Sequence, residues 1–519
     1  MASDSVETEA KLGAWPGFEL PIVDGVVPGL RAEAGEPRTL DATYVDAPDL
    51  RLIRAGISLR HRAGEGGPDG LWTLKLPNDA DVGDGVLRRR ELTVPGSNGP
   101  VPTELAVLVR PWLRTASLGV VAHLQTVRRT ATLVVDPEAG GADEADGGGP
   151  VPVGSVDDDE VSVLQEGRVG ARFREVEVEV VEGAPDGLLD AVVAVLRDAG
   201  AGAPDPTPKL VRALGPRALQ PSDLARIDVA DDASAAEVLR AGIAASVLRI
   251  VEHDAVIRAD EEPEGIHQAR VGMRRLRSDL KTFAPLLDTA WSEPLREELR
   301  WVAGELGEVR DRDVLGARLR DQLAVLPEPE RAAAAAVLVR LAKERQRALT
   351  KAVATLDSRR YLALLDRLVA AVNEPRTLPA ADAPGKDVLP GLAADAFHTL
   401  RKGARKLGKH PADEALHEAR IKAKKARYAA DVAVPVVGDA VKAYTKAMGA
   451  LQDVLGDHHD CAVAEAWLTE ATRAATRGQA FALGQLVAHQ RHEADRLRGE
   501  WRAAWEAVDR KKLTAWMSG

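Results

Sequence analysis

Cysteine, aromatic residues and long apolar runs are scarce in this sequence, and each scarcity excludes a class of protein. The single cysteine, Cys461, cannot form a disulfide within the chain and cannot supply a cysteine-rich zinc site, which fits a reducing compartment. No uninterrupted apolar run reaches about 18 residues, so we expect no membrane-spanning helix. Aromatic residues make up 3% of the chain, which leaves few platforms for stacking single-stranded nucleic acid.

The amino terminus also lacks a basic segment followed by an apolar stretch, and carries Asp4, Glu7 and Glu9 instead. We therefore expect a cytoplasmic protein that is not exported. The 519 residues include 45% apolar side chains and carry a formal net charge of -11. This composition is typical of a globular protein, and the length is enough for two or more domains.

The charges divide the chain into two chemically different parts. Residues 1–230 contain 23 Lys and Arg against 37 Asp and Glu, whereas residues 231–519 contain 46 against 43. Runs bounded by Gly and Pro predict strands in the first part, at 57–62, 71–76, 87–94, 126–135 and 174–181, with Gly- and Asp-rich loops at 63–70 and 137–159. From residue 234 onward, Ala, Leu, Arg and Glu at helical spacing predict helices. We expect domains at 1–215 and 231–519, joined by a linker at 216–230.

Charged residues recur at every second position within the predicted strands. Near the start, Glu7, Glu9 and Lys11 would project from one face of a strand. A solvated edge strand would give the same pattern on its own. Arg60 and Arg62 repeat it, however, as do the glutamates at 175, 177 and 179. A set of such strands predicts a closed antiparallel barrel whose lumen is polar and binds a ligand.

The chemistry of such a lumen limits the kinds of ligand that it can bind. Several Arg and Lys side chains inside a barrel repel one another and lose hydration unless a multiply charged anion or facing carboxylates compensate them. A linear triphosphate would satisfy them, because guanidinium groups bind phosphate oxygens in pairs. Clustered glutamates favour Mg²⁺ or Mn²⁺. A metal could neutralise charge on the transferred phosphoryl group while a glutamate orients or deprotonates a water.

Separate motifs of the first part follow the order seen in one family. They are Glu7-x-Glu9-x-Lys11, Thr43 to Leu50, Leu59-Arg60-x-Arg62, Leu74-Lys75, Arg90-x-Leu92, Arg129, Glu175 to Glu179 and Lys209. Over about residues 4–215 this set resembles a CYTH domain, the fold of the triphosphate tunnel metalloenzymes. The resemblance implies an eight-stranded antiparallel tunnel and a Mg²⁺- or Mn²⁺-dependent attack on a triphosphate. Substrates in the family range from tripolyphosphate to thiamine triphosphate and ATP.

The resemblance assigns roles to these residues by position. Glu7, Glu9 and Lys11 are the expected catalytic residues. Phosphate binding is expected of Lys11, Arg60, Arg62, Lys75, Arg88, Arg90, Arg129 and Lys209. Metal binding is expected of Glu7, Glu9, Glu175 and Glu177, while the role of Glu179 stays open. By strand parity, Arg89 and Glu91 are expected to face outward.

The second part contains an internal repeat, at about residues 235–370 and 390–515. The pattern His267-x-x-Arg270-x-x-x-Arg274-Arg275-x-Arg277 returns as His417-x-x-Arg420-x-x-x-Lys424-Lys425-x-Arg427. On a helix, the histidine and three of the cations of each copy lie on one stripe. One such stripe is usually a solvated helix face. Two copies packed with pseudo-twofold symmetry would instead form a groove of positive potential.

This repeat resembles a CHAD domain over about residues 231–515, and CYTH followed by CHAD is a known arrangement among inorganic triphosphatases. The resemblance implies binding of inorganic polyphosphate. The expected contacts are His267, Arg270, Arg274, Arg275, Arg277, Arg401, Arg405, His417, Arg420, Lys424, Lys425 and Arg427. For the two histidines, an anion contact or a helix–helix hydrogen bond is favoured over a metal. Nucleic acid is a competing polyanion, but the chain has no recognised base-reading motif.

The sequence therefore predicts a multidomain α and β protein, with an N-terminal eight-stranded antiparallel tunnel and a C-terminal all-α duplicated bundle. It would hydrolyse tripolyphosphate with Mg²⁺ or Mn²⁺ in the tunnel and bind polyphosphate on the basic helices. Association with polyphosphate granules is a further expectation, and a homo-oligomer stays open. Two alternatives also stay open: a polyphosphate-binding protein without activity, and a thiamine triphosphatase or adenylate cyclase.

Overall fold

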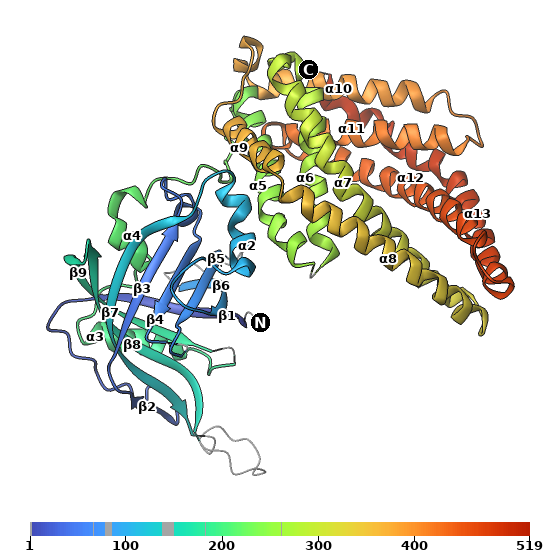
Figure 1. Cartoon of the computed structure of the whole chain (residues 1–519). Helices are drawn as coiled ribbons and strands as arrows, with labels where there is room; N and C mark the ends of the chain where they lie inside the picture. Colours follow the sequence, from blue (N-terminus) through green and yellow to red (C-terminus); the bar gives the residue numbers. More distant parts are fainter. Residues whose placement is uncertain are drawn as a thin grey trace. The chain divides into compact units, whose positions relative to one another are not determined.

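Two compact units, Met1–Asp223 and Leu224–Gly519, make up the computed structural model of this chain. It describes residues 3–65, 67–77, 86–136, 150–181, 183–260 and 262–518, with the exception of the side chains of residues 3–7 and 86–89. The described strands all lie in the first unit, whereas helices make up the second (Figure 1). None of the described helices is both long and apolar enough to cross a membrane.

The first unit is built on one antiparallel sheet. Its strands are β1 (Ser3–Ala14), β2 (Leu30–Ala34), β3 (Arg38–Asp46), β4 (Ser58–Ala63), β5 (Leu71–Pro77), β6 (Val86–Pro95), β7 (Gly119–Val135), β8 (Val151–Gln165) and β9 (Arg168–Val180). The order is β2-β7-β3-β4-β5-β6-β1-β9-β8, and an additional β7–β8 pairing closes every strand except β2 into a ring. The predicted eight-stranded antiparallel architecture is confirmed, with β2 added beside β7.

The strands carry their apolar residues on the outside of this ring. Val176 and Val178 of β9 belong to a core cluster with α3 (Leu188–Asp198). Trp72 of β5 and Leu92 of β6 pack in a second cluster with α2 (Thr103–Leu113). Because side chains alternate along a strand, the residues between these apolar positions point to the opposite, inner face. The outer helices therefore supply the hydrophobic burial, which leaves the inner face free to be charged.

Two short helices and a 3-10 turn complete the first unit. They are α1 (Arg51–Arg54), α4 (Lys209–Leu214) and η2 (Gly215–Arg217). The chain beyond η2 remains attached to this unit as far as the boundary at Asp223. Arg54 donates to the carbonyl oxygen of Pro221, and Arg114 pairs with Asp223. The predicted linker at 216–230 is thus divided between the two units.

One predicted loop was wrong in part. Residues 137–149 of the expected loop at 137–159 lie outside the described residues, but β8 already begins at Val151. Asp157, Asp158 and Asp159, which suggested a solvated loop, are buried in this strand. Basic side chains from neighbouring elements compensate them: Arg128 pairs with Asp157 at 2.5 Å, and Arg174 with Asp158 at 2.8 Å. Buried carboxylates are tolerated when they are paired in this way.

The second unit is a duplicated helical bundle. Its helices are α5 (Ala235–Ala259), α6 (Pro263–Thr282), α7 (Thr289–Gln322), α8 (Glu330–Leu356), α9 (Arg359–Asn373), α10 (Gly385–Ala404), α11 (Asp413–Val437), α12 (Asp439–Thr472), α13 (Arg477–Val508) and α14 (Lys511–Thr514), with 3-10 turns η3 (Ala284–Leu286), η4 (Leu323–Val325), η5 (Pro379–Asp382) and η6 (Ala515–Met517). Consecutive helices pack together from α5 to α8 and again from α10 to α13, and α6 also packs against α11. These contacts bring the two copies of the basic motif, on α6 and α11, side by side.

A buried carboxyl group in this bundle gives a prediction for the pH dependence of stability. Burial raises the pKa of Asp279 on α6 to about 7, and its main cationic neighbour, Arg275, is 3.9 Å away. Because this pKa is higher in the folded than in the unfolded chain, the folded state binds the extra proton between about pH 4 and pH 7. The free energy of unfolding should therefore fall by up to about 4 kcal/mol as the pH rises over that range, and it should level off at higher pH.

An Asp279→Asn variant should remove this loss. Its thermal transition, compared with that of the wild type, should rise more at pH 8 than at pH 5. Asp453→Asn, which changes an exposed aspartate of α12, is the matched control and should shift neither transition. An equal effect of Asp279→Asn at both pH values would show that Asp279 does not titrate in this range.

Candidate functional site

A cavity of about 280 Å³ lies within the ring of strands. Its wall is contributed by strands β1, β3, β4, β5, β6, β7 and β9 together with the start of α4. The lining residues are Glu9, Lys11, Tyr44, Ser58, Arg60, Arg62, Glu65, Leu71, Lys75, Glu91, Arg128, Glu177, Glu179, Pro208, Lys209 and Leu210. Eleven of these side chains carry a formal charge, so the inner face of the ring is a charged chamber rather than a packed core.

Seven residues expected from the sequence meet in this cavity. They are Glu9, Lys11, Arg60, Arg62, Lys75, Glu177 and Lys209. Lys11 lies opposite Glu177 in the β1–β9 pairing, two residues from the facing pair Glu9 and Glu179. The side chain of Glu7 lies outside the described residues. Strand pairing therefore assembles in space most of a set that spans about 200 positions of the chain.

The expectation for β6 was wrong by one residue. Glu91, expected to face outward, lines the cavity and pairs with Lys75 at 2.6 Å. Arg90 is one strand position out of phase with Glu91, because it pairs with Leu76 while Glu91 pairs with Lys75, and it therefore has the opposite parity. Arg88 has the parity of Arg90, although its side chain lies outside the described residues. The sequence cannot show which of three consecutive arginines face the cavity, because both faces of the strand then carry arginine. The register with β5 and β1 decides it.

The expectation for β7 was wrong in the same way. Arg129, expected to bind phosphate, is 45% exposed and pairs with Glu160 at 2.9 Å, outside the cavity. Its neighbour Arg128 lines the cavity and reaches Asp159 at 2.6 Å and Glu177 at 2.9 Å. No local signal distinguished the two arginines, because residues 157–160 of β8 are acidic at both parities, so that Asp159 faces Arg128 and Asp158 faces Arg129.

On β9 the two glutamates that line the cavity are not the pair expected from the sequence, which was Glu175 and Glu177. Glu177 and Glu179 line the cavity, whereas Glu175, expected to bind metal, does not. Glu175 is fully buried, where it contacts Lys209 at 2.8 Å and Arg212 at 3.5 Å. It thus anchors α4 to the barrel. Among the polar lining residues, the sequence analysis assigned no role to Tyr44, Ser58, Glu65 and Arg128.

The cavity carboxylates are held ionised by the cations around them. Burial by itself would raise the pKa of Glu177, but Lys11 at 2.5 Å, Lys209 at 2.8 Å and Arg128 at 2.9 Å lower it well below its usual range. Burial likewise opposes ionisation of Glu9, and the ammonium of Lys11 at 3.1 Å outweighs it, so that the pKa of Glu9 is lowered. At neutral pH both side chains are therefore hydrogen-bond acceptors.

The donor chemistry of the cavity fits a hard divalent cation. Glu9, Glu177 and Glu179 supply carboxylate oxygens, which Mg²⁺ and Mn²⁺ prefer. Within the described ranges, no group of three or more His, Cys, Asp or Glu side chains already surrounds a metal position. Because Glu177 accepts from three cations, a metal would have to share it with Lys11, Arg128 and Lys209.

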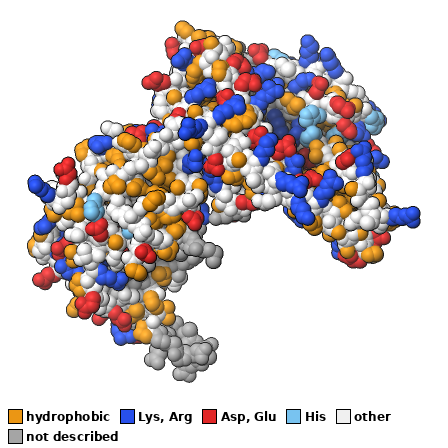
Figure 2. Space-filling model, in the orientation of Figure 1, with side chains coloured by type: hydrophobic (Ala, Val, Ile, Leu, Met, Phe, Trp, Pro, Cys, Tyr) orange, Lys and Arg blue, Asp and Glu red, His pale blue; other side chains and the backbone are white. Residues whose placement is uncertain are grey.

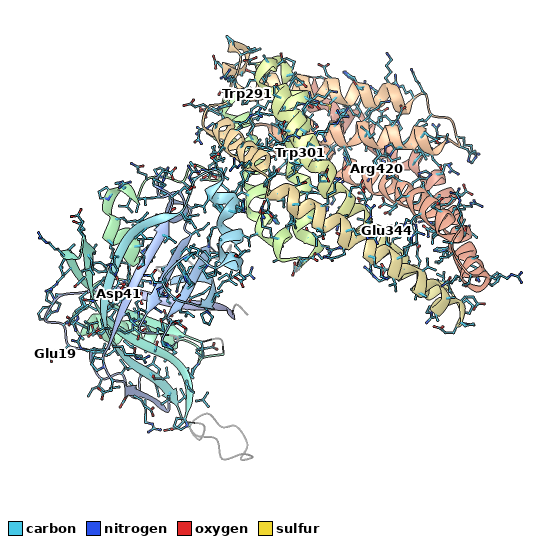
Figure 3. All side chains as sticks on the ribbon, in the orientation of Figure 1. Glu19, Asp41, Trp291, Trp301, Glu344 and Arg420 are labelled. Carbon is cyan, nitrogen blue, oxygen red and sulfur yellow. The ribbon has the colours of Figure 1, made fainter. Side chains whose placement is uncertain are left out.

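A second charged site lies in the helical unit. This groove of about 830 Å³ is lined by Arg270, Arg274, Arg277, Ser278, Lys281, Thr282, Pro285, Arg296, Leu392, Asp395, Ala396, Thr399, Arg420, Ile421, Lys422, Lys424, Lys425 and Tyr428. Figure 2 shows Lys and Arg side chains gathered in a hollow of this unit. Arg420, labelled in Figure 3, projects from α11 into the region between the helices. We call this site the basic groove.

Six of the cations expected from the repeat line the basic groove, namely Arg270, Arg274, Arg277, Arg420, Lys424 and Lys425. The structure adds three that the repeat did not suggest, Lys281, Arg296 and Lys422. Both copies of the motif thus contribute to one surface, because α6 packs against α11. A stripe on a single helix would have remained an ordinary solvated face.

The other six expected residues do not line this groove, and their part in polyphosphate binding stays a prediction. They are His267, Arg275, Arg401, Arg405, His417 and Arg427. Three of the cations have protein partners instead: Arg275 lies 4.0 Å from Asp431, Arg401 pairs with Asp509 at 2.9 Å, and Arg427 donates to Gln452 at 3.3 Å. His417 makes the helix–helix type of hydrogen bond that we favoured, to His459 on α12 at 3.1 Å.

The cations of the basic groove differ from those of the cavity because most of them lack acidic partners. Among the described residues, Arg274, Lys424 and Lys425 have no carboxylate within ion-pair distance. The buried Nε atoms of Arg274 and Arg420 also have no hydrogen-bond acceptor. Burial, reinforced by Arg420 and Arg274, lowers the pKa of Lys424 to about 7. The groove therefore holds uncompensated positive charge, which a bound polyanion would relieve.

The fold and the two sites define a protein in which a charged β tunnel precedes a duplicated bundle with a basic groove. Family models agree with this description: one for the CYTH domain matches residues 7–209, and one for the CHAD domain matches residues 241–469. The chain belongs to the family of proteins in which a CYTH domain is followed by a CHAD domain. The CYTH family binds triphosphate substrates and includes triphosphatases and cyclases, which makes the first unit a candidate enzyme.

Relatives match the whole length of this arrangement. The uncharacterized proteins MT2285 and Rv2226 of two Mycobacterium tuberculosis strains, CDC 1551 / Oshkosh and H37Rv, are each 31% identical to this chain. The similarity covers 97% of this chain and 96% of each relative. Among solved structures, PptA from Streptomyces chartreusis is 27% identical, with a TM-score of 0.46 over 53% of this chain and 100% of that one. The CHAD domain from the plant Ricinus communis is 27% identical, with a TM-score of 0.45 over 55% and 96%.

Proposed function

We propose that the first unit hydrolyses inorganic triphosphate in a metal-dependent reaction and that the second unit binds inorganic polyphosphate. The observation that carries the first proposal is the composition of the cavity wall. Six cations, Lys11, Arg60, Arg62, Lys75, Arg128 and Lys209, surround a space of about 280 Å³ together with buried carboxylates. A short, highly charged phosphate chain matches such a wall in charge and in hydrogen-bonding groups.

Substrate binding would replace ion pairs that the lining side chains make with one another. Lys75 is held by Glu91, Arg62 by Glu65, and Lys11 by Glu9 and Glu177. Phosphate oxygens can take over these cations, since they accept the same charge-assisted hydrogen bonds. Arg60 lines the same space, and its guanidinium group donates to the hydroxyl of Tyr44 at 3.1 Å. The cations thus position the substrate and spread its charge.

The carboxylates released in this exchange would serve the chemistry. Glu9 is ionised and lines the cavity, so it can orient a water molecule and accept its proton as the water attacks phosphorus. Glu9 and Glu177, with Glu179 beside them, are the residues that would hold Mg²⁺ or Mn²⁺. When bound, the ion would neutralise charge on the phosphoryl oxygens.

The proposal for the second unit rests on the uncompensated cations of the basic groove. Nine Lys and Arg side chains line it against a single carboxylate, that of Asp395. Repulsion among these cations costs free energy until an anion enters, and a linear polymer can contact several of them at once. We expect the groove to bind polyphosphate with an affinity that falls as the salt concentration rises.

The experiment that tests both proposals is phosphate release by the purified full-length chain. Tripolyphosphate, thiamine triphosphate, ATP and long-chain polyphosphate would each be tested with Mg²⁺, Mn²⁺ or a chelator. Release from tripolyphosphate that a chelator abolishes supports the inorganic triphosphatase. A clear preference for thiamine triphosphate or ATP would replace that substrate, and no release from any of them would leave a binding protein.

The neighbouring residues Arg128 and Arg129 offer a matched test of where the substrate lies. Arg128→Lys keeps the charge in the cavity but removes the planar fork, so kcat/KM for tripolyphosphate should fall about tenfold to a hundredfold. Arg129→Lys changes an exposed side chain outside the cavity and should leave kcat/KM within about twofold. The reverse result, a larger loss for Arg129→Lys, would show that the substrate does not occupy this cavity.

A further inference from the structure

Lys424 occupies an unusual position within the basic groove. It projects from α11 as a half-buried side chain, and the cations facing it are Arg270 and Arg274 of α6 and Arg420 of its own helix. On the α12 side its charged or titratable neighbours are Asp460 and His459. Among the described residues, no carboxylate lies within ion-pair distance of its ammonium group. An amine thus lines the same cavity as three guanidinium groups, those of Arg270, Arg274 and Arg420.

The two neighbouring lysines on the same helix have different surroundings. Lys422 also lines the groove but lies 3.4 Å from Glu418, one helical turn away. Lys425 lines the groove as an exposed side chain and faces Lys281 and Arg296 rather than the three arginines. The cluster around Lys424 is therefore a specific arrangement, because nearby lysines of the same groove do not share it.

We propose that Lys424 is a site of covalent acylation by acyl phosphates, small anions that carry a phosphate group on an activated carbonyl. Arg270, Arg274 and Arg420 would bind the phosphate group, since guanidinium groups donate paired hydrogen bonds to phosphate oxygens. The amine of Lys424 would then lie beside the carbonyl carbon. Burial, reinforced by the same three cations, disfavours protonation of the amine, and the pKa of about 7 leaves roughly half of it neutral at pH 7.

The reaction balances without a further reactant. The lone pair of Nζ attacks the carbonyl carbon and forms a C–N bond, and the C–O bond to phosphate breaks. Inorganic phosphate leaves with the electron pair of that bond, and the proton lost by the nitrogen passes to water. The product is an amide that can no longer carry the positive charge of Lys424. Acylation would therefore remove one cation from the centre of the groove and weaken its hold on a polyanion.

This inference goes beyond the proposed binding of polyphosphate and does not require it. Any anion that occupies the guanidinium cluster should shield the amine, whether or not polyphosphate is the ligand of the groove. The two proposals therefore make separate predictions, one about reaction at a single nitrogen and one about binding of a polymer.

The test uses the full-length wild-type chain and acetyl phosphate, with acetylation at each lysine followed over time by peptide mass spectrometry. Lys424 should react about tenfold faster at pH 7 than Lys442, an exposed lysine paired with Asp439, because an ordinary lysine is almost fully protonated there. The rate at Lys424 should level off above about pH 7, whereas that at Lys442 should keep rising. Equal rates at the two lysines would overturn the proposal.

A second reagent isolates the part played by the arginines. Acetic anhydride carries no charge, so the preference for Lys424 over Lys442 should be smaller with it than with acetyl phosphate. Arg274→Gln should slow the reaction of Lys424 with acetyl phosphate, while Arg491→Gln, outside the groove and paired with Glu465, should not. The same preference with both reagents, or no effect of Arg274→Gln, would show that the cluster does not bring the acyl phosphate to Lys424.

Long-chain polyphosphate added before acetyl phosphate separates the two proposals. Protection of Lys424, and weaker polyphosphate binding after acetylation, are the expected results. If Lys424 is acetylated preferentially but polyphosphate neither binds nor protects it, the polyphosphate proposal fails and the acylation site stands. If polyphosphate binds and Lys424 is unreactive, the acylation site fails alone.

Discussion

A Glu9→Gln variant is expected to lose triphosphate hydrolysis by about a hundredfold to ten thousandfold in kcat, the range typical for removal of a general base. The substitution keeps the shape of the side chain and removes the charge that pairs with Lys11 at 3.1 Å. It takes away the acceptor for the proton of the attacking water and one of the expected oxygen ligands for the metal. Steady-state phosphate release from tripolyphosphate measures the effect.

The control for this variant is Glu19→Gln, which changes an exposed glutamate of the same unit, labelled in Figure 3. It should retain wild-type kcat. Polyphosphate binding by the Glu9→Gln protein should also be unchanged, because the basic groove belongs entirely to the helical unit. Retention of activity by Glu9→Gln, or an equal loss of hydrolysis and polymer binding, would contradict the assignment of the two functions to separate units.

Reversing two charges at the centre of the basic groove is expected to weaken polyphosphate binding by about a hundredfold or more at low salt, since each lost phosphate contact also removes a counterion-release contribution. The variant is Arg274→Glu with Lys424→Glu, one residue from each copy of the repeat. It introduces carboxylates among Arg270, Arg277 and Arg420, so that these arginines would form ion pairs within the protein. Titration of labelled polyphosphate at several salt concentrations measures the change.

A matched double variant, Lys442→Glu with Arg491→Glu, makes the same change in net charge on exposed positions outside the groove. It should weaken binding only slightly. Both double variants should keep the triphosphatase activity of the tunnel, and an unchanged helical circular dichroism signal reports that the second unit is folded. Wild-type binding that does not respond to salt, or equal losses in the two double variants, would argue against a specific basic groove.

Much of the fold could be predicted from local patterns. The alternation of Val and Glu in β9 indicated a strand with one charged face, and the ring of strands has that form. The repeated basic motif indicated two related helices, which are α6 and α11 in the duplicated bundle. Both patterns are local because the periods of a strand and of a helix are properties of the backbone.

The wrong predictions of which side chains of β6 and β7 face the cavity share one physical origin. In β6 and β7 adjacent arginines occupy both parities, so the local pattern is the same whichever of them faces the cavity. The choice was made by pairing with distant strands: Glu91 pairs with Lys75 of β5, and Arg128 reaches Glu177 of β9. A shift of one residue exchanges the two faces of a strand, and only the neighbouring strands fix that shift.

The sequence by itself determined the two-part organisation of this protein, the charged inner face of its barrel and the kinds of group available to bind phosphate, because these follow from composition and from backbone periodicity. Only the tertiary structure decided which of those groups meet. It selected Arg128, Glu91 and Glu179 for the cavity and placed Glu175 under α4. Among the described residues, it left Arg274, Lys424 and Lys425 of the groove without a carboxylate partner. Such choices depend on contacts between residues far apart in the chain, whose energies no local pattern records.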